Sequence, residues 1–138
     1  ILDIDYFKQY NDRYGHQAGD DCVRAIAALI RQMESDQIFC ARYGGDEFVI
    51  IYSGMSAEEV CERAEKLRQD VMALQIEQRY TEGAFGVTIS QGICHDIPSN
   101  GNKNWDFLHV ADQTLYRVKR RGRNRLCMTD IHGREIEV

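Results

Sequence analysis

The sequence predicts an α/β fold in which a central mixed, partly antiparallel sheet is surrounded by helices. Short runs of β-branched and aromatic residues alternate with helical patterns, which is typical of strands and helices packed in layers. Gly44 and Gly45 separate two of the strand-like runs and indicate a hairpin, so at least one strand pair is antiparallel. The 138 residues fit one domain, and no boundary divides them.

Five short segments have the composition of strands. They span residues 1–4, 39–43, 48–52, 87–93 and 125–129. After the first strand, Phe7, Tyr10 and Tyr14 recur at spacings that form an amphipathic turn with these rings in the core. The tail 130–138 either forms a hairpin with the last strand or frays, and both alternatives stand.

Three segments carry apolar residues at spacings of three and four, the period of an amphipathic helix. The first spans residues 20–33. The second begins at Ser56, and Glu59 three residues later completes a capping-box pattern. The third spans residues 105–120 and ends before Gly122, a common C-terminal signal.

Composition excludes several classes of protein. The apolar fraction of 43% includes no long apolar run, and the first residues lack the features of a signal peptide. We therefore expect a cytoplasmic domain without direct membrane contact, although other regions of a longer protein could anchor it. The five cysteines have no CxxC pair or zinc spacing, which predicts free thiols. The net charge of -5 argues against nucleic-acid binding.

One segment reverses this acidic character. Residues 117–125 read RVKRRGRNR and are strongly basic. Such a local reversal suggests a site for a small anion. The alternative is a solvated helix end whose positive charges are favoured by the helix dipole.

Acidic residues interrupt two apolar strands. Asp46 and Glu47 directly follow the glycine pair, and Asp3 and Asp5 alternate along the first strand. If Asp3, Asp46 and Glu47 converge within about 4 Å, each pair of like charges costs on the order of 4 kcal/mol, so a cation must offset them. Oxygen ligands open on one side suit Mg²⁺ shared with substrate phosphates. The sequence contains no motif of a serine, cysteine or histidine nucleophile, so the pattern favours phosphoryl chemistry. For any single acidic residue, the alternative is a solvated position in a turn.

These residues lie in three segments that resemble the GGDEF domain of the diguanylate cyclase family. The segments are DIDYFKQYNDRYGHQAGD at 3–20, RYGGDEF at 42–48 and ADQTLYRVKRRGRN at 111–124. They occur in the family's order and at its separations, and a chance match to all three is negligible beside a chance match to one. The resemblance covers nearly the whole chain.

The resemblance implies a palm-like nucleotide cyclase fold and the synthesis of cyclic di-GMP. Two GTP-loaded domains would face each other as a homodimer, and each 3′-hydroxyl would attack the other nucleotide's α-phosphate and release pyrophosphate. Mg²⁺ or Mn²⁺ would be the cofactor. Asp3, the Ile4 carbonyl and Asp46 would hold it, and Glu47 would be a further ligand or would help to deprotonate the hydroxyl.

The resemblance also assigns the substrate contacts. The β- and γ-phosphates would meet Lys8 and the backbone of Tyr6 and Phe7, guanine would meet Asn11 and Asp20, and the terminal phosphates would be clamped by Lys119 and Arg123. Asp20 could instead cap a helix that begins near residue 21.

Two features depart from the family pattern. At the family's Arg-x-x-Asp product-binding positions this chain reads Ser35-Asp36-Gln37-Ile38, which predicts weak feedback inhibition through that site. The second departure is at the N-terminus: the resemblance implies a single GGDEF domain over residues 1–138 without the family's N-terminal helix and its LTGLxNR-like stretch. In the full protein we expect an upstream sensory domain.

A second class of function competes with the enzyme. A catalytically silent GTP-binding regulatory module would share the fold, but such modules lose motif residues. Every metal and phosphate residue of the motifs is intact here, which favours the active cyclase. A polymerase-palm fragment is disfavoured because an acidic chain of this length offers no template-binding surface.

Overall fold

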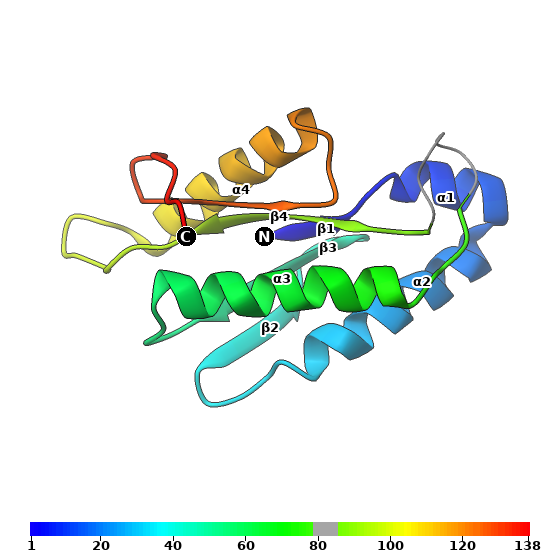
Figure 1. The fold of residues 1–138 in the computed structure, drawn as a ribbon, viewed down its shortest axis with the longest axis horizontal. Coiled ribbons are helices and arrows are strands. Elements are labelled where there is room, and N and C mark those ends of the chain that lie inside the picture. Colours follow the sequence, from blue (N-terminus) through cyan, green and yellow to red (C-terminus); the bar gives the residue numbers. More distant parts are fainter. Residues whose placement is uncertain (79–85) are drawn as a thin grey trace.

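The computed structural model describes residues 1–78 and 86–138 (Figure 1). The elements in chain order are β1 (Leu2–Ile4), α1 (Phe7–Tyr14), α2 (His16–Arg31), β2 (Ile38–Arg42), β3 (Glu47–Tyr52), α3 (Ala57–Ala73), β4 (Ile89–Cys94), α4 (Asn104–Arg120) and β5 (Leu126–Thr129). Each predicted strand is present, with ends that differ by one or two residues.

The sheet has the strand order β2-β3-β1-β4-β5. Neighbouring strands are antiparallel except β4 and β5, which are parallel, so the predicted mixed sheet is confirmed. The glycine pair lies in the β2–β3 hairpin, where the Tyr43 amide donates to the Glu47 carbonyl at 2.8 Å. β1 is the central strand, so the acidic residues of the first motif lie in the middle of the sheet.

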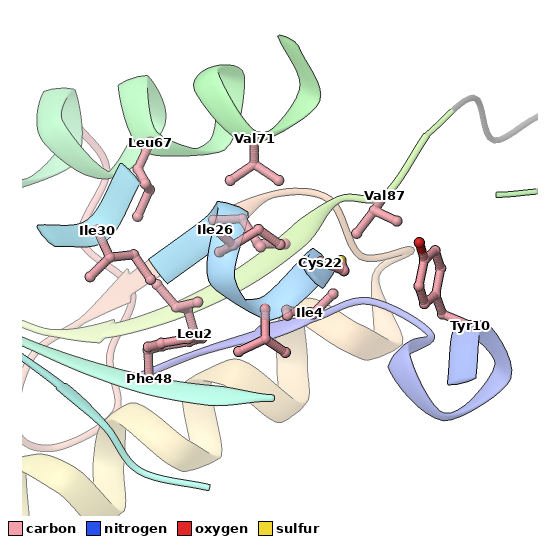
Figure 2. Packing of buried hydrophobic residues seen from close by; sticks show 12 residues of the cluster. Leu2, Ile4, Tyr10, Cys22, Ile26, Ile30, Phe48, Leu67, Val71 and Val87 are labelled. Carbon is pink, nitrogen blue, oxygen red and sulfur yellow. The ribbon is translucent and has the colours of Figure 1, made fainter. Parts of the chain in front are cut away.

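Helices α2 and α3 cover one face of the sheet, and α4 lies on the other (Figure 1). The main core lies beneath α2 and α3, where Leu2 of β1 and Phe48 of β3 meet Ile26 and Leu67 (Figure 2). Burial of each such side chain contributes about 1.5–3 kcal/mol. Since Leu2 and Ile4 of β1 face this core, the alternation of the strand turns Asp3 toward α4.

One predicted helix boundary is wrong. Helix α2 begins at His16 rather than at residue 20, and Gly15, with φ of 91°, separates it from α1. The first two residues of α2, His16 and Gln17, are polar and exposed, so apolar periodicity could not detect the start of the helix. The capping box of Ser56 and Glu59 is confirmed at the start of α3.

The tail folds back on β5, as the hairpin alternative predicted. The Ile136 amide donates to the Met128 carbonyl at 2.9 Å, and Thr129 bridges to Glu135. Arg121 forms an ion pair with Glu135, and Arg117 donates to the Gly133 carbonyl at 2.8 Å. Part of the basic segment therefore holds the tail.

All five cysteines are free thiols, as predicted. Within the described residues, none of the helices combines the length and apolar character needed to cross a bilayer.

Candidate functional site

A pocket of about 190 Å³ opens at the C-terminal end of β1. It lies where the end of β1, the start of α1, the β2–β3 hairpin and the end of α4 meet. Its lining is Asp3, Ile4, Asp5, Tyr6, Phe7, Lys8, Gln9, Asp46, Lys119 and Arg123. The fold thus brings together all the predicted site residues except Glu47, Asn11 and Asp20.

The pairing of β1 with β3 brings two carboxylate-bearing residues side by side. Asp3 is the direct register partner of Glu47, and directly opposed residues of an antiparallel pair share a face. The Ile4 amide donates to the Asp46 carbonyl at 3.2 Å, which fixes the Asp46 backbone beside the end of β1. Two like charges opposite each other destabilise the pair unless a cation lies between or beside them.

Lys119 supplies positive charge to this acidic end of the sheet. It lies in the last turn of α4 and forms an ion pair with Oδ2 of Asp3, which is only 5% exposed. Burial raises the pKa of Asp3 to about 6, although the hydrogen bond and charge of Lys119 act in the opposite direction. Oδ1 of Asp3 is buried and has no hydrogen-bond partner among the described residues.

The donor set fits a hard divalent cation. Asp3 and Asp46 line one pocket with Ile4, and the unpartnered Oδ1 of Asp3 is an oxygen ligand without a protein donor. In the described part of the chain, no group of three or more His, Cys, Asp or Glu side chains is arranged to hold a metal ion. The predicted convergence of Asp3, Asp46 and Glu47 on one ion therefore stays a prediction.

The backbone turns sharply at Tyr6 to begin α1. Tyr6 has φ of 56°, a left-handed conformation that is uncommon for a residue with a side chain. The residue at the N-cap position of α1 makes no side-chain capping hydrogen bond to the first turn. The first amides of a helix have no partner within it and favour anions. Since Phe7 and Lys8 line the pocket, the start of α1 offers donors to a phosphate group.

Arg123 approaches the same pocket from the other side. Its guanidinium lies 4.6 Å from the centre of the Tyr6 ring, and Nη1 donates to Tyr6 Oη at 3.5 Å. A cation stacked on an aromatic ring is held in place while its remaining donors stay available. Lys119 and Arg123 thus place two positive charges beside the start of α1.

Asn11 and Asp20 lie outside this pocket. Asn11 packs against α2, where a Cβ on Gly19 would lie 1.7 Å from its Oδ1 atom. That Oδ1 is buried without a hydrogen-bond partner among the described residues. Asp20 is exposed and lies inside α2, so the alternative that it caps this helix is wrong. Gly19 directly precedes Asp20, so α1 and α2 bring the two predicted guanine contacts into one neighbourhood.

A larger cavity, of about 790 Å³, lies elsewhere and contains none of the predicted site residues. It is bounded by β3, β4 and the first half of α4, with Val49, Ile93 and Leu108 in its lining. Its lining is mainly apolar. Asp96, His95 and Lys103 also line it, but its described lining has no pair of acidic residues like Asp3 and Asp46.

Asp5 has no predicted role in the site, although the sequence shows it as one of the two acidic residues of the first strand. Asp5 is 3% exposed and accepts hydrogen bonds from Thr88 Oγ1 at 2.7 Å and Ser90 Oγ at 2.6 Å. The alternation of Asp5 with Asp3 along the first strand was the sequence pattern that could have indicated a role for Asp5. Arg68 and Asn124, which meet beside Asp5, were missed because they are 56 residues apart and no local pattern connects them.

Comparison with known proteins gives a consistent result. A family model described as diguanylate cyclase, GGDEF domain, matches residues 1–125. The chain is 36% identical over 127 residues to diguanylate cyclase VdcA of Vibrio cholerae, covering 91% of this chain and 37% of that protein. It is 35% identical over 130 residues to uncharacterized protein YhcK of Bacillus subtilis, covering 94% of this chain and 35% of that protein.

Solved structures share the fold. The GGDEF domain of DgcB from Caulobacter crescentus, in complex with c-di-GMP, has a TM-score of 0.81 and 36% identity, covering 95% of this chain and 75% of that chain. This likeness confirms the predicted palm-like nucleotide cyclase fold. The chain spans about a third of the length of the curated relatives named above, at 35% and 37%.

Proposed function

The chain belongs to the GGDEF domain family of diguanylate cyclases, and on that premise we propose that it condenses two GTP molecules into cyclic di-GMP with release of two pyrophosphates. The observation that carries the proposal is the pocket at the end of β1. There, Asp3 and Asp46 line one pocket with Lys119, Arg123 and the first turn of α1, and Lys119 is ion-paired with Asp3. A triphosphate with a divalent cation matches this combination of charges.

The acidic side of the pocket would hold the cation. Asp3 and Asp46 would contribute carboxylate oxygens, and Ile4 its carbonyl. Mg²⁺ or Mn²⁺ bound there supplies charge that neutralises the phosphates and lowers the pKa of the attacking hydroxyl. Glu47 would be a further ligand or would accept the 3′-hydroxyl proton, and its register pairing with Asp3 supports this role.

The basic side would position the triphosphate. Lys8 and the backbone of Tyr6 and Phe7 line the pocket at the start of α1, where they would bind the β- and γ-phosphates. Lys119 would turn from Asp3 to the terminal phosphates, and Arg123 would reach them from its place above Tyr6. The guanine base would be read by Asn11 and Asp20 at the α1–α2 junction.

The reaction requires two nucleotides, whereas this pocket fits the phosphates of one. We therefore propose that residues 1–138 act as one GGDEF unit that pairs with a second copy, so that each 3′-hydroxyl meets the other nucleotide's α-phosphate. A sensory domain elsewhere in the longer protein would control this pairing, and cytoplasmic GTP would be the substrate.

The experiment is incubation with GTP and Mg²⁺, and separately Mn²⁺, over a range of protein concentrations, with products separated by chromatography. Cyclic di-GMP should appear, and turnover per protein should rise with protein concentration before levelling off. A specific activity that stays constant deep into the monomeric range contradicts the paired mechanism.

Two variants test the roles of the acidic residues, and the parent chain itself separates the cyclase from the silent module. Asp46→Asn and Glu47→Gln should each lower turnover by on the order of 100-fold or more, because they remove charge that holds the cation or activates the hydroxyl. Glu62→Gln, on the exposed face of α3, is the matched control and should keep parental activity. Binding of GTP without any cyclic di-GMP from the parent chain would favour the regulatory module.

A further inference from the structure

The loop that follows α4 has an uncommon backbone conformation. Arg123 has φ of 63° and Asn124 has φ of 47°, so two successive residues with side chains are left-handed. Such conformations are unfavourable for most residues and persist where the surrounding structure holds them. Arg123 is one of the two cations of the pocket, so whatever holds this turn also sets the position of a proposed phosphate contact.

One anchor lies in the sheet. The Asn124 amide donates to Asp5 Oδ2 and to Ser90 Oγ, both at 3.1 Å. Asp5 and Ser90 are themselves buried and joined by a hydrogen bond of 2.6 Å. The turn is therefore fixed to the end of β1, the strand that carries Asp3.

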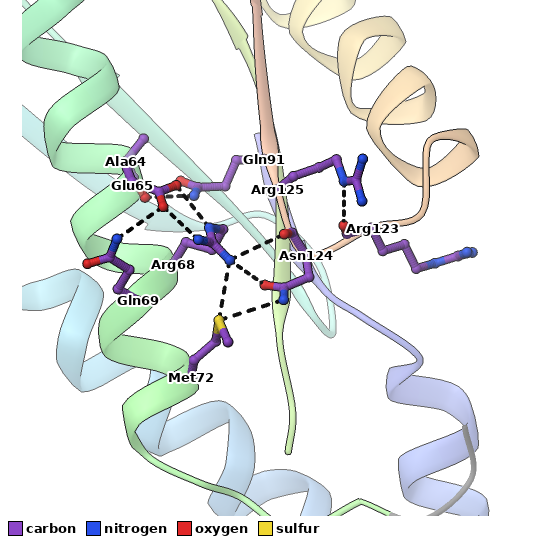
Figure 3. A network of polar contacts seen from close by, with 9 residues as sticks. All are labelled: Ala64, Glu65, Arg68, Gln69, Met72, Gln91, Arg123, Asn124 and Arg125. Carbon is purple, nitrogen blue, oxygen red and sulfur yellow. Dashed lines mark hydrogen bonds and ion pairs between the residues drawn. The ribbon is translucent and has the colours of Figure 1, made fainter. Parts of the chain in front are cut away.

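The second anchor comes from α3. Nη1 of Arg68 donates to the Asn124 carbonyl at 3.3 Å and to its side-chain Oδ1 at 3.0 Å (Figure 3). The opposite edge of the same guanidinium binds Glu65 through Nη2 at 2.6 Å and Nε at 2.9 Å, and Gln69 donates to Glu65 at 3.1 Å. A guanidinium held on both edges has little freedom to rotate, so it is a rigid support for the turn.

Arg68 supports the turn from the side opposite the pocket. Figure 3 shows the Arg123 side chain extending from the turn away from Arg68. Arg68 does not line the pocket, whereas Arg123 does. Within the turn, Arg125 Nε donates to the Arg123 carbonyl at 2.9 Å. The contacts on Asn124 thus fix the residue next to Arg123 without using the guanidinium that faces the pocket.

We infer that Arg68 and Asn124 are positioning residues, which hold the left-handed turn so that Arg123 presents its guanidinium to the terminal phosphates of the nucleotide. The inference rests on the proposed function, because it takes the pocket to be the triphosphate site. It adds helix α3, which contributes no side chain to the pocket, to the elements that determine triphosphate affinity.

The test compares affinities for 3′-deoxy-GTP and GMP by calorimetry in the presence of Mg²⁺. The missing 3′-hydroxyl prevents turnover, and GMP lacks the terminal phosphates. Arg123→Met should weaken 3′-deoxy-GTP binding by about tenfold and leave GMP binding unchanged. Arg68→Met should reproduce this selective loss at about three- to tenfold. The Arg68→Met and Arg123→Met double variant should be no weaker than Arg123→Met alone, because both act through one contact.

Two further variants control for folding. Arg63→Met, on the exposed face of α3, should keep the parental ratio of the two affinities. In Asn124→Gly the new residue also accepts the left-handed backbone, but the side-chain oxygen that accepts a hydrogen bond from Arg68 is gone. We therefore expect a selective loss of 3′-deoxy-GTP affinity smaller than that of Arg68→Met. Asn124→Gly carries the test if Arg68→Met does not fold.

The possible failures are distinguishable. Losses that multiply in the double variant, or an Arg68→Met or Asn124→Gly protein that folds and keeps the parental ratio, overturn the inference while the proposed function stands. A parent chain that binds 3′-deoxy-GTP no more tightly than GMP overturns the proposed function, and the inference falls with it.

Discussion

Asp3 is the residue in which stability and function conflict most directly. It is buried beside the carboxylate-bearing residues of the hairpin, and burial raises its pKa from 3.8 to about 6 despite Lys119. The native protein therefore binds more protons than the unfolded chain between about pH 4 and pH 6. Stability from this group falls as the pH rises through that window, and the cost is fully present above pH 6.

We predict that Asp3→Asn stabilises the metal-free protein at pH 7.5 by on the order of 2 kcal/mol, because it removes a buried charge. Thermal melts in the presence of a chelator would show a Tm several degrees above that of the parent at pH 7.5 and a difference that shrinks toward pH 4. Turnover should be lost. A variant that melts below the parent at pH 7.5 would show that the ion pair with Lys119 outweighs the burial of the charge.

Gly19 has no side chain, and the Asn11 side chain occupies the space that a Cβ would need. Because a Cβ there would lie 1.7 Å from Oδ1 of Asn11, Gly19→Ala must displace that side chain. The displaced atom is the end of a flexible side chain, and alanine favours the helix, so the fold should lose little or gain slightly. We predict that selectivity for GTP over ATP falls about tenfold or more while the Tm changes little.

The measurement is paired titration of the variant with the two nucleotides. Gly101→Ala is the control, because the nearest atom to its new Cβ is a serine hydroxyl 4.0 Å away. Unchanged selectivity in folded Gly19→Ala would mean that Asn11 does not read the base.

Individual site residues could be predicted where they lie next to a recognisable sequence pattern. Asp46 and Glu47 follow a glycine pair, and Lys119 lies in a basic run, so each was visible in a short window of sequence. The roles of Arg68 and Asn124 were not visible in this way, because an arginine on a helix and an asparagine in a basic run are common on solvated surfaces. Their contact depends on the docking of α3 beside β5, which sequence periodicity does not specify.

At the scale of elements, the packing of α4 on β4 depends on one glycine. A Cβ on Gly92 would lie 2.2 Å from the Leu115 amide nitrogen and 2.4 Å from the Ala111 carbonyl oxygen. These are backbone atoms of α4, so they cannot yield by a side-chain rotation. Helix and sheet approach so closely that any side chain at position 92 must displace α4.

We predict that Gly92→Ala destabilises the protein by about 2 kcal/mol or more, since α4 must move away from the sheet. Urea unfolding followed by circular dichroism would measure the loss. Because α4 carries Lys119, turnover should fall even under conditions in which the variant is folded. Parental stability for this variant would show that α4 can slide over β4 without cost.

Element boundaries show where sequence periodicity succeeds and where it fails. The strands and the start of α3 were predicted closely, because β-branched runs and a capping box are local signals. The start of α2 was missed, since its first turn, with His16 and Gln17, is exposed and makes no apolar pattern. The order of the strands was also out of reach, because it depends on contacts between distant segments.

At the scale of the whole molecule, the position of β1 joins the proposed cation site to global stability. β1 pairs with β3 on one side and with β4 on the other, and its side chains anchor the core beneath α2. The turn that carries Arg123 lies at the surface and is held by the side chains of Arg68 and Asp5 and by a few backbone hydrogen bonds, such as that from the Arg123 amide to the Val118 carbonyl at 3.1 Å. The two sides of the pocket are therefore supported by structure of very different strength.

This difference has a consequence for amide hydrogen exchange. The amides of β1 should exchange only when the whole domain unfolds, whereas those of residues 122–125 should exchange through local opening. Nucleotide binding should therefore raise the opening free energy of β1 by the gain in global stability, and that of the turn by up to the same gain from a much lower starting value. Mass spectrometry of exchanged peptides would measure both, and faster exchange in β1 than in the turn would contradict the assignment. The carboxylate side would then act as a fixed template present in every folded molecule, and the turn that carries Arg123 as the part whose local opening a bound nucleotide suppresses.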